Sequence, residues 1–199
     1  MYRIVKTKYT NMKPTSKSTK LKIPSFSYFQ KPISNVQPKS QVDLLDVYHL
    51  IKSETFLTQT NTLRNLGDTQ EARDFKSKNF DYVTFSGTFS KRCESGLIKH
   101  SELLSLDIDD MVEIIPLMVA LLVDQYFDTQ LLFTSPSGKG IKWIISIDLT
   151  IASHNEYFQA VANYLQKTYK VIVDPICKDV TRACFLPHDA NVTINPNYL

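Results

Sequence analysis

The feature that most constrains the fold is an apolar run that ends in acidic residues, from Leu103 to Asp109. Its Leu and Ile content is typical of a buried strand, and Asp107 and Asp109 stand two positions apart at its end. Residues i and i+2 of a strand point to the same face, so both carboxylates are expected to meet. Like charges held so close are unfavourable unless a cation neutralises them. The run therefore predicts a site for Mg²⁺ or Mn²⁺; the alternative is solvated loop acids, with Asp110 capping the next helix.

A glycine-containing turn between two further apolar runs is the second feature. Residues 131–134 and 141–147 are expected to be strands. The turn between them, with the start of the second strand, supplies candidate nucleotide-binding residues: Ser137, Gly138, Lys139, Gly140 and Lys142. Glycines allow close approach of the backbone to a ligand, and successive N–H groups can form an anion-binding nest. The alternative is an ordinary hairpin turn with solubilising lysines, since the spacing of a Walker P-loop is absent.

Lys142 has a further expectation attached to it. Its neighbours Ile141 and Trp143 should point to the opposite face of the strand, toward the core. Lys142 is therefore expected to be partly solvated, on the side of a ligand cleft, and to be replaceable by Ala without loss of the fold.

The third feature is an acid near the C-terminus. Residues 171–173 are expected to form a strand that stops at Asp174 and Pro175, because proline cannot donate to a sheet ladder. Asp174 is a candidate third metal ligand, and Arg182 is a candidate fork for phosphate or for one of the acids. The alternatives are a plain Asp-Pro turn and a surface ion pair between Arg182 and Asp179.

The remaining pattern favours an α+β fold with a largely antiparallel central sheet and flanking helices, because strands and helices mix without a strict βαβ rhythm. The helical spacing of apolar residues indicates a helix at 43–52, capping patterns indicate helices that begin near Asp68 and Ser153, and alternation indicates a strand at 80–86. The domain boundaries expected from this pattern are a basic flexible arm at 1–25 and a single domain at 26–199, with a helical N-terminal part at 26–79 and a sheet-containing core at 80–199.

Charge and composition limit the cellular location and the binding partners that the sequence predicts. Nine of the 23 Lys and Arg residues lie in residues 1–40, which contain no acid, so residues 41–199 carry 14 basic and 20 acidic residues. The basic arm is suited to nucleic-acid phosphates, and a solvated tail explains the same residues. The three cysteines form no Cys-x-x-Cys pair, and neither a secretory signal nor a membrane-spanning stretch is legible. A cytoplasmic protein with no membrane partner is expected.

Together these motifs resemble the archaeo-eukaryotic primase superfamily, which includes primase-polymerases, and more closely the N-terminal domain of VirE-type proteins. The likeness covers roughly residues 26–199. It is carried by residues 84–89, 106–109, 135–142 and 181–182, and by Asp189, Asn195 and Pro196. One departure is Lys142, where many superfamily members have His; lysine holds a phosphate only as a point charge.

The resemblance implies a primase-polymerase-like fold and a metal-dependent nucleotidyltransferase domain of a replication or mobile-element protein. Asp107, Asp109 and Asp174 would then be catalytic and hold two Mg²⁺ or Mn²⁺ ions. The triphosphate would be bound by the turn residues, Lys142 and Arg182. The implied partners are nucleoside triphosphates, single-stranded DNA or a primer-template, and a helicase partner or fused domain. The alternatives are a catalytically inactive nucleotide- or DNA-binding module attached to a helicase-type protein, and a metal-dependent glycosyltransferase.

Overall fold

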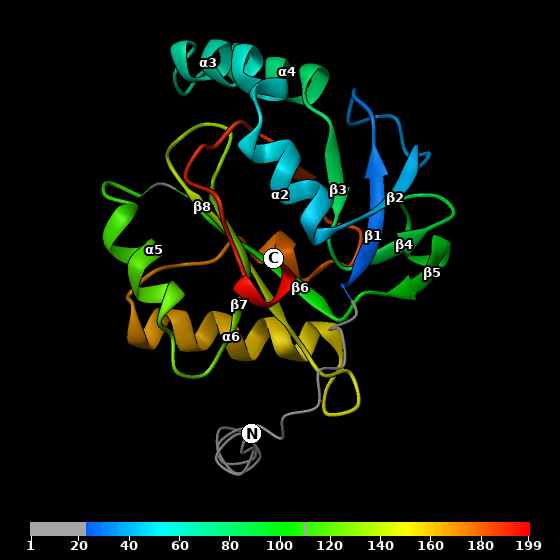
Figure 1. The fold of residues 1–199 in the computed structure, drawn as a ribbon, viewed down its shortest axis with the longest axis vertical. Coiled ribbons are helices and arrows are strands. Elements are labelled where there is room, and N and C mark those ends of the chain that lie inside the picture. The colour runs from blue at the N-terminus through cyan, green and yellow to red at the C-terminus, as the bar shows by residue number, and fades with distance from the viewer. Residues whose placement is uncertain (1–22, 110) are drawn as a thin grey trace.

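The computed structural model describes residues 23–109 and 111–199, and all strand pairs in this part of the chain are antiparallel. The expected α+β class with a largely antiparallel sheet arrangement is therefore confirmed (Figure 1). One four-stranded sheet has the order β2-β1-β3-β9 and a second has the order β10-β7-β8-β6. A two-stranded sheet, β4-β5, accompanies them.

The strands have the following bounds. The first sheet contains β1 (Ser25–Phe29), β2 (Ser40–Asp43), β3 (Tyr82–Thr84) and β9 (Cys184–Phe185). The second sheet contains β6 (Leu103–Ile108), β7 (Thr129–Thr134), β8 (Ile141–Ser146) and β10 (Thr193–Ile194). The small sheet consists of β4 (Gly87–Phe89) and β5 (Leu97–His100).

Five α-helices and several short 3₁₀ helices surround the sheets in the described residues. The α-helices are α2 (Leu44–Lys52), α3 (Leu57–Asn65), α4 (Gln70–Asn79), α5 (Ile115–Leu122) and α6 (His154–Thr168). The 3₁₀ helices are η1 (Glu54–Phe56), η2 (Glu94–Gly96), η3 (Pro175–Lys178) and η4 (Pro196–Tyr198). None of the described helices has the length and apolar character needed to cross a membrane.

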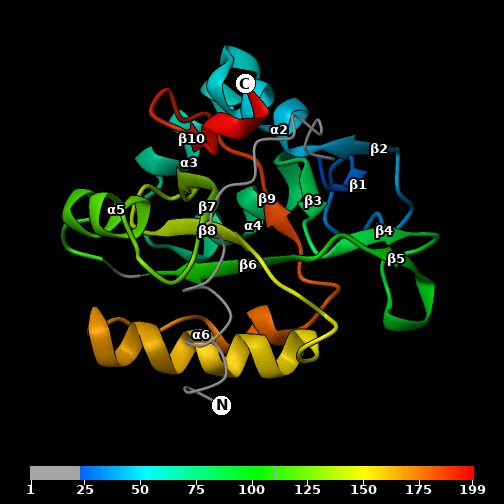
Figure 2. The ribbon, with the colours of Figure 1, turned by 60° about the horizontal axis from the view of Figure 1, so that its bottom comes forward.

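The strands of the second sheet carry apolar residues in continuous runs rather than in alternation, so apolar side chains project from both faces of the sheet. Both faces are covered by other elements. We call the two resulting clusters the α2 core and the α6 core. The α2 core lies between this sheet, α2 and the first sheet, and includes Phe26, Val47, Leu103, Phe133 and Ile144. The α6 core includes Leu104, Leu106, Ile108, Leu121, Trp143, Ile145, Phe158 and Val161. Figure 2 shows α6 along one face of the sheet and α2 with β1 to β3 on the other.

Local signals fix the ends of the helices that hold this arrangement. Asp43 caps α2, where its carboxylate accepts from two backbone N–H groups. Ser153 with Glu156 forms the expected capping box at α6. The cap of α4 differs by one residue from the expectation: Thr69, not Asp68, accepts from the Ala72 N–H.

Two expectations about the chain's organisation need correction. The N-terminal part, 26–79, was expected to be helical, but it also contains β1 and β2, which pair with each other. The boundary of the arm also shifts, because Ser25 is the first residue of β1. Residues 1–22 of the arm, and the suggested cap residue Asp110, lie outside the described residues.

Candidate metal and phosphate site

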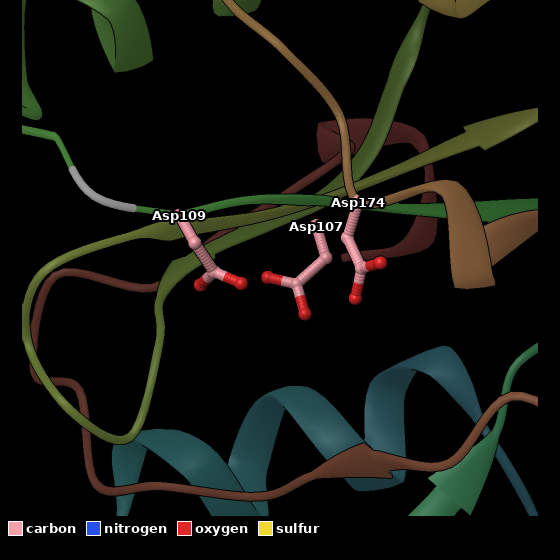
Figure 3. A group of neighbouring side chains, drawn as sticks. All are labelled: Asp107, Asp109 and Asp174. Carbon is pink, nitrogen blue, oxygen red and sulfur yellow. The ribbon is translucent and has the colours of Figure 1, made fainter.

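Three carboxylates meet at the end of β6. Asp107, Asp109 and Asp174 each offer one oxygen, and these oxygens all lie within 4.8 Å of one another. Asp107 is in β6 and Asp109 follows it, so the two-residue spacing places both on one side of the strand. Figure 3 shows the three side chains pointing to the same side. The expected convergence of these residues is what the structure has.

Asp174 reaches the cluster by a different route from the one expected. Residues 171–173 are not in a strand. Instead, the Asp174 N–H donates to the backbone oxygen of Asp107 at 2.9 Å, and this bond sets the two residues side by side. The Asp174 carboxylate also caps η3, because its Oδ1 accepts from the Ile176 N–H at 3.0 Å. Pro175 is the first residue of η3, and the β-branched residues 171–173 before it pair with no strand.

Lys142 lies directly opposite Asp107 across the β6–β8 ladder, and its Nζ forms an ion pair with Asp107 Oδ2. The expectation of a partly solvated Lys142 is therefore wrong, since its side chain is only 12% exposed. Ile141 and Trp143 do face the α6 core, but the opposite face is covered as well. Burial lowers the pKa of Lys142 to about 8, because the charged amine loses its hydration.

Arg182 joins two of the three acids. Its Nη2 lies 2.7 Å from Asp174 Oδ2 and 3.4 Å from Asp107 Oδ2. The alternative surface pair with Asp179 is replaced by a backbone contact, in which the Arg182 N–H donates to the Asp179 oxygen at 3.0 Å. Arg182 thus contacts the acids, as one of its two expected roles requires, but through a single nitrogen and not as a fork.

One oxygen of the cluster has no partner in the described part of the chain. Asp107 is 4% exposed, and its Oδ1 makes no hydrogen bond there. A buried carboxylate oxygen without a donor costs free energy, and a cation beside it would remove that cost. Three carboxylates against Lys142 and Arg182 also leave a local charge of −1. The residues present therefore fit a divalent cation with oxygen ligands.

The cluster opens into a pocket of about 240 Å³. Asp107, Asp109, Lys142 and Arg182 line it, and Ser137 lies at its edge with an exposed side chain. Acids, bases and a hydroxyl thus share one small cavity.

The glycine turn packs against this site and makes most of its hydrogen bonds within itself. The Gly138 N–H donates to the Ser135 oxygen at 2.9 Å, and the Lys139 N–H donates to Ser137 Oγ at 3.4 Å. Gly138 has a φ of +79°, which favours glycine. Lys139 is exposed and is not among the residues that line the pocket.

Gly140 has a packing role that the sequence did not suggest. A Cβ at this position would lie 2.6 Å from the Ile108 oxygen and 2.8 Å from Asp109 Oδ1. Only glycine lets the turn approach the end of β6 so closely. Gly140 therefore positions Asp109, which is a different task from cradling a phosphate.

Three basic residues near the site were missed by sequence reasoning. Lys76 of α4 and Arg92, in the connection between β4 and β5, line the pocket. Arg64 of α3 donates from Nε to the Pro136 oxygen at 3.3 Å and lies against the turn. Lone basic residues on helices and loops are common, so nothing in their spacing marks them.

These features define an α+β protein with a pocket of carboxylates and basic residues where the antiparallel strands β6 and β8 meet a glycine turn. Residues 74–193, more than half of the chain, match the family model of the BT4734-like, N-terminal domain, so the chain belongs to this family. The matched region contains all three carboxylates and the turn. The assignment to VirE-type N-terminal domains and the primase superfamily is thereby corrected, because the match is to a different family. The searches of curated proteins and of solved structures returned no match.

Proposed function

We propose that the protein is a metal-dependent nucleotidyltransferase that extends DNA in the manner of a primase or polymerase, and that the pocket is its active site. The observation that supports this most is the convergence of three carboxylate oxygens within 4.8 Å of one another. In addition, Oδ1 of Asp107 has no hydrogen-bond partner among the described residues. A primase-polymerase-like arrangement of the core belongs to the same proposal.

The carboxylates have the role of holding the ion. Asp107, Asp109 and Asp174 would bind Mg²⁺ or Mn²⁺, which supplies a Lewis acid for phosphoryl oxygens and a lowered pKa for an attacking hydroxyl. Asp107 and Asp174 keep their second oxygens on Lys142 and Arg182, which fixes the direction of the remaining oxygens. The carboxylates are thus oriented before any ligand arrives.

The basic residues have the role of balancing charge. Lys142 and Arg182 reduce the charge of the three acids to −1, so one divalent ion would make the site net positive. A positive site attracts a triphosphate and stabilises the charge that develops during phosphoryl transfer. The proposed partners are accordingly nucleoside triphosphates and single-stranded DNA or a primer-template, with a helicase-type protein as a further partner.

Primer extension tests the proposal. The wild-type protein, a labelled primer-template, deoxynucleoside triphosphates and Mn²⁺ should give longer primers. Asp109→Asn should abolish extension, because the amide weakens the ion site, whereas Asp74→Asn, at an exposed position of α4, should leave it unchanged. Equal extension by wild type and Asp109→Asn would refute a role for the carboxylate cluster.

A second candidate function is a non-catalytic module that binds nucleotide or DNA for a helicase-type protein. The ion pairs favour it, because they already occupy one oxygen each of Asp107 and Asp174. This candidate predicts Mn²⁺ and nucleotide binding by calorimetry without primer extension under any metal condition.

A further inference from the structure

Two basic side chains in the pocket are not neutralised by a carboxylate within the described chain. The four ion pairs found there include neither Lys76 nor Arg92, although both line the pocket. Lys142 and Arg182, by contrast, are paired with Asp107 and Asp174. Within the described residues, the basic groups of the pocket that form no ion pair therefore lie on the wall formed by α4 and the β4–β5 connection, while Asp179 also lines the pocket.

Arg92 is held in a fixed orientation on this wall. Its Nε donates to the Tyr82 hydroxyl at 3.1 Å, and its Nη2 donates to the Ile33 oxygen at 3.0 Å. The guanidinium also lies over the Tyr82 ring, 5.2 Å from the centroid. These contacts use two of the five N–H groups of the side chain, so a fork-shaped donor is already oriented for an anion.

Lys76 rests on the same aromatic cluster as Arg92. Its Nζ lies 5.9 Å from the centroid of Phe185, which also lines the pocket. Phe185 is itself held edge-on by Phe80 and Tyr82. Both basic groups therefore rest on the same aromatic support, and their side chains lose little further freedom when a ligand binds.

We propose that Lys76 and Arg92 bind the terminal phosphates of a nucleoside triphosphate, in place of the glycine turn. This inference rests on the proposed function, which puts the reacting phosphate at the carboxylates. Lys76 and Arg92, across the pocket, then face one end of the bound nucleotide. Because neither is in an ion pair within the described residues, their positive charges favour the anionic triphosphate end. The turn is poorly suited to this task, because the Gly138 and Lys139 amides donate within it.

Calorimetric titration with inorganic triphosphate, in EDTA and at low salt, tests the assignment. Lys76→Met keeps the apolar length of the side chain and removes its charge. It should weaken binding roughly ten- to hundredfold, the effect of losing one charge-assisted contact. Lys78→Met is the matched control: Lys78 is exposed on the same helix, does not line the pocket, and should bind like wild type.

Arg92 needs a variant that spares the fold, because its bonds to Tyr82 and Ile33 are structural. Arg92→Lys keeps the charge and loses the fork, so it should weaken triphosphate binding severalfold. Inorganic monophosphate carries less negative charge than triphosphate and should bind weakly to all variants. Equal triphosphate affinity in wild type, Lys76→Met and Lys78→Met would overturn the inference. A loss confined to oligonucleotide binding would overturn it too, since the pair would then hold a nucleic-acid strand.

A separate titration with Mn²⁺ alone keeps the two proposals apart. Lys76→Met should bind Mn²⁺ like wild type, because Lys76 contacts none of the three carboxylates by an ion pair. Wild-type protein that binds triphosphate through Lys76 but takes up no Mn²⁺ would sink the nucleotidyltransferase proposal and leave the phosphate assignment standing.

Discussion

At the scale of single residues, Asp107 and Lys142 are two buried charges that depend on each other. Lys142→Met should lower the free energy of unfolding by on the order of 3 kcal/mol, because it leaves Asp107 buried with only the longer contact to Arg182. Urea denaturation measures this, and the double variant Asp107→Asn/Lys142→Met should recover part of the loss. The exposed Lys139→Met serves as control and should change stability by less than about 0.5 kcal/mol. A Lys142→Met protein as stable as wild type would contradict the inference that the buried charges of Asp107 and Lys142 stabilise each other.

Gly140 offers a way to disturb the ion site without removing a ligand. In Gly140→Ala the new Cβ would collide with the Ile108 oxygen and with Asp109, so the Asp109 carboxylate must move. We expect at least tenfold weaker Mn²⁺ binding, together with a stability loss of about 1–3 kcal/mol from overpacking. Calorimetry and urea denaturation measure the two effects. Unchanged Mn²⁺ affinity in a folded Gly140→Ala protein would show that the position of Asp109 does not matter to the ion.

At the scale of elements, the strands and helices with strong local signals were predictable. The apolar runs that became β6 and β8 and the capping boxes of α2 and α6 carry their structure in neighbouring residues. β1 and β2 were missed, since they are short and the second partner of β1, the strand β3, lies far along the chain. The same limit applies to the site. The spacing of Asp107 and Asp109 predicts their meeting, whereas Lys76 and Arg92 are brought in only by tertiary packing.

Two histidines join the end of β5 to the start of α6 and give stability a pH dependence. His100 Nε2 and His154 Nδ1 lie 3.1 Å apart. Burial lowers the pKa of His100 to about 4, with a further contribution from His154, and burial lowers the pKa of His154 as well, although Asp179 acts in the opposite direction. Well above a pH of about 6.5, the ordinary pKa of histidine, both rings are neutral in the folded and unfolded chain, so the pair does not reduce the stability there. As pH falls from about 6.5 toward 4, only the unfolded chain takes up these protons, so stability declines.

Urea midpoints at several pH values between 7 and 4.5 check this expectation. His100→Gln should flatten the decline, because it removes one of the two depressed groups and leaves the carboxylates unchanged. Identical pH profiles for wild type and His100→Gln would show that the histidine pair does not carry the effect.

At the scale of the whole molecule, the ion site gathers β6, β8 and the segment that leads into η3, so a bound ion should stabilise the fold itself. A ligand that binds only the folded state at 100 times its Kd adds about 2.7 kcal/mol. For a chain of this size that corresponds to a Tm increase of roughly 5–10 °C. Differential scanning calorimetry with and without Mn²⁺ measures it, and EDTA should reverse it. Asp109→Asn should show a much smaller increase; an equal one would place the ion elsewhere.

The alignment of β6 with β8 has a consequence for how the sheet selects its own register. Asp107 stands opposite Lys142, and Leu106 stands opposite Trp143. A slip of one residue would turn the side chains of a strand to the other face, so Asp107 would enter the apolar layer beneath α6 while Lys142 faced a leucine. Two separated charges in such surroundings cost several kcal/mol, which penalises the misaligned sheet far more than a slip between apolar residues. The pair that shapes the pocket therefore also disfavours misaligned pairing of β6 with β8 during folding. A substitution that removes either charge should both alter the pocket and weaken the preference for the native register.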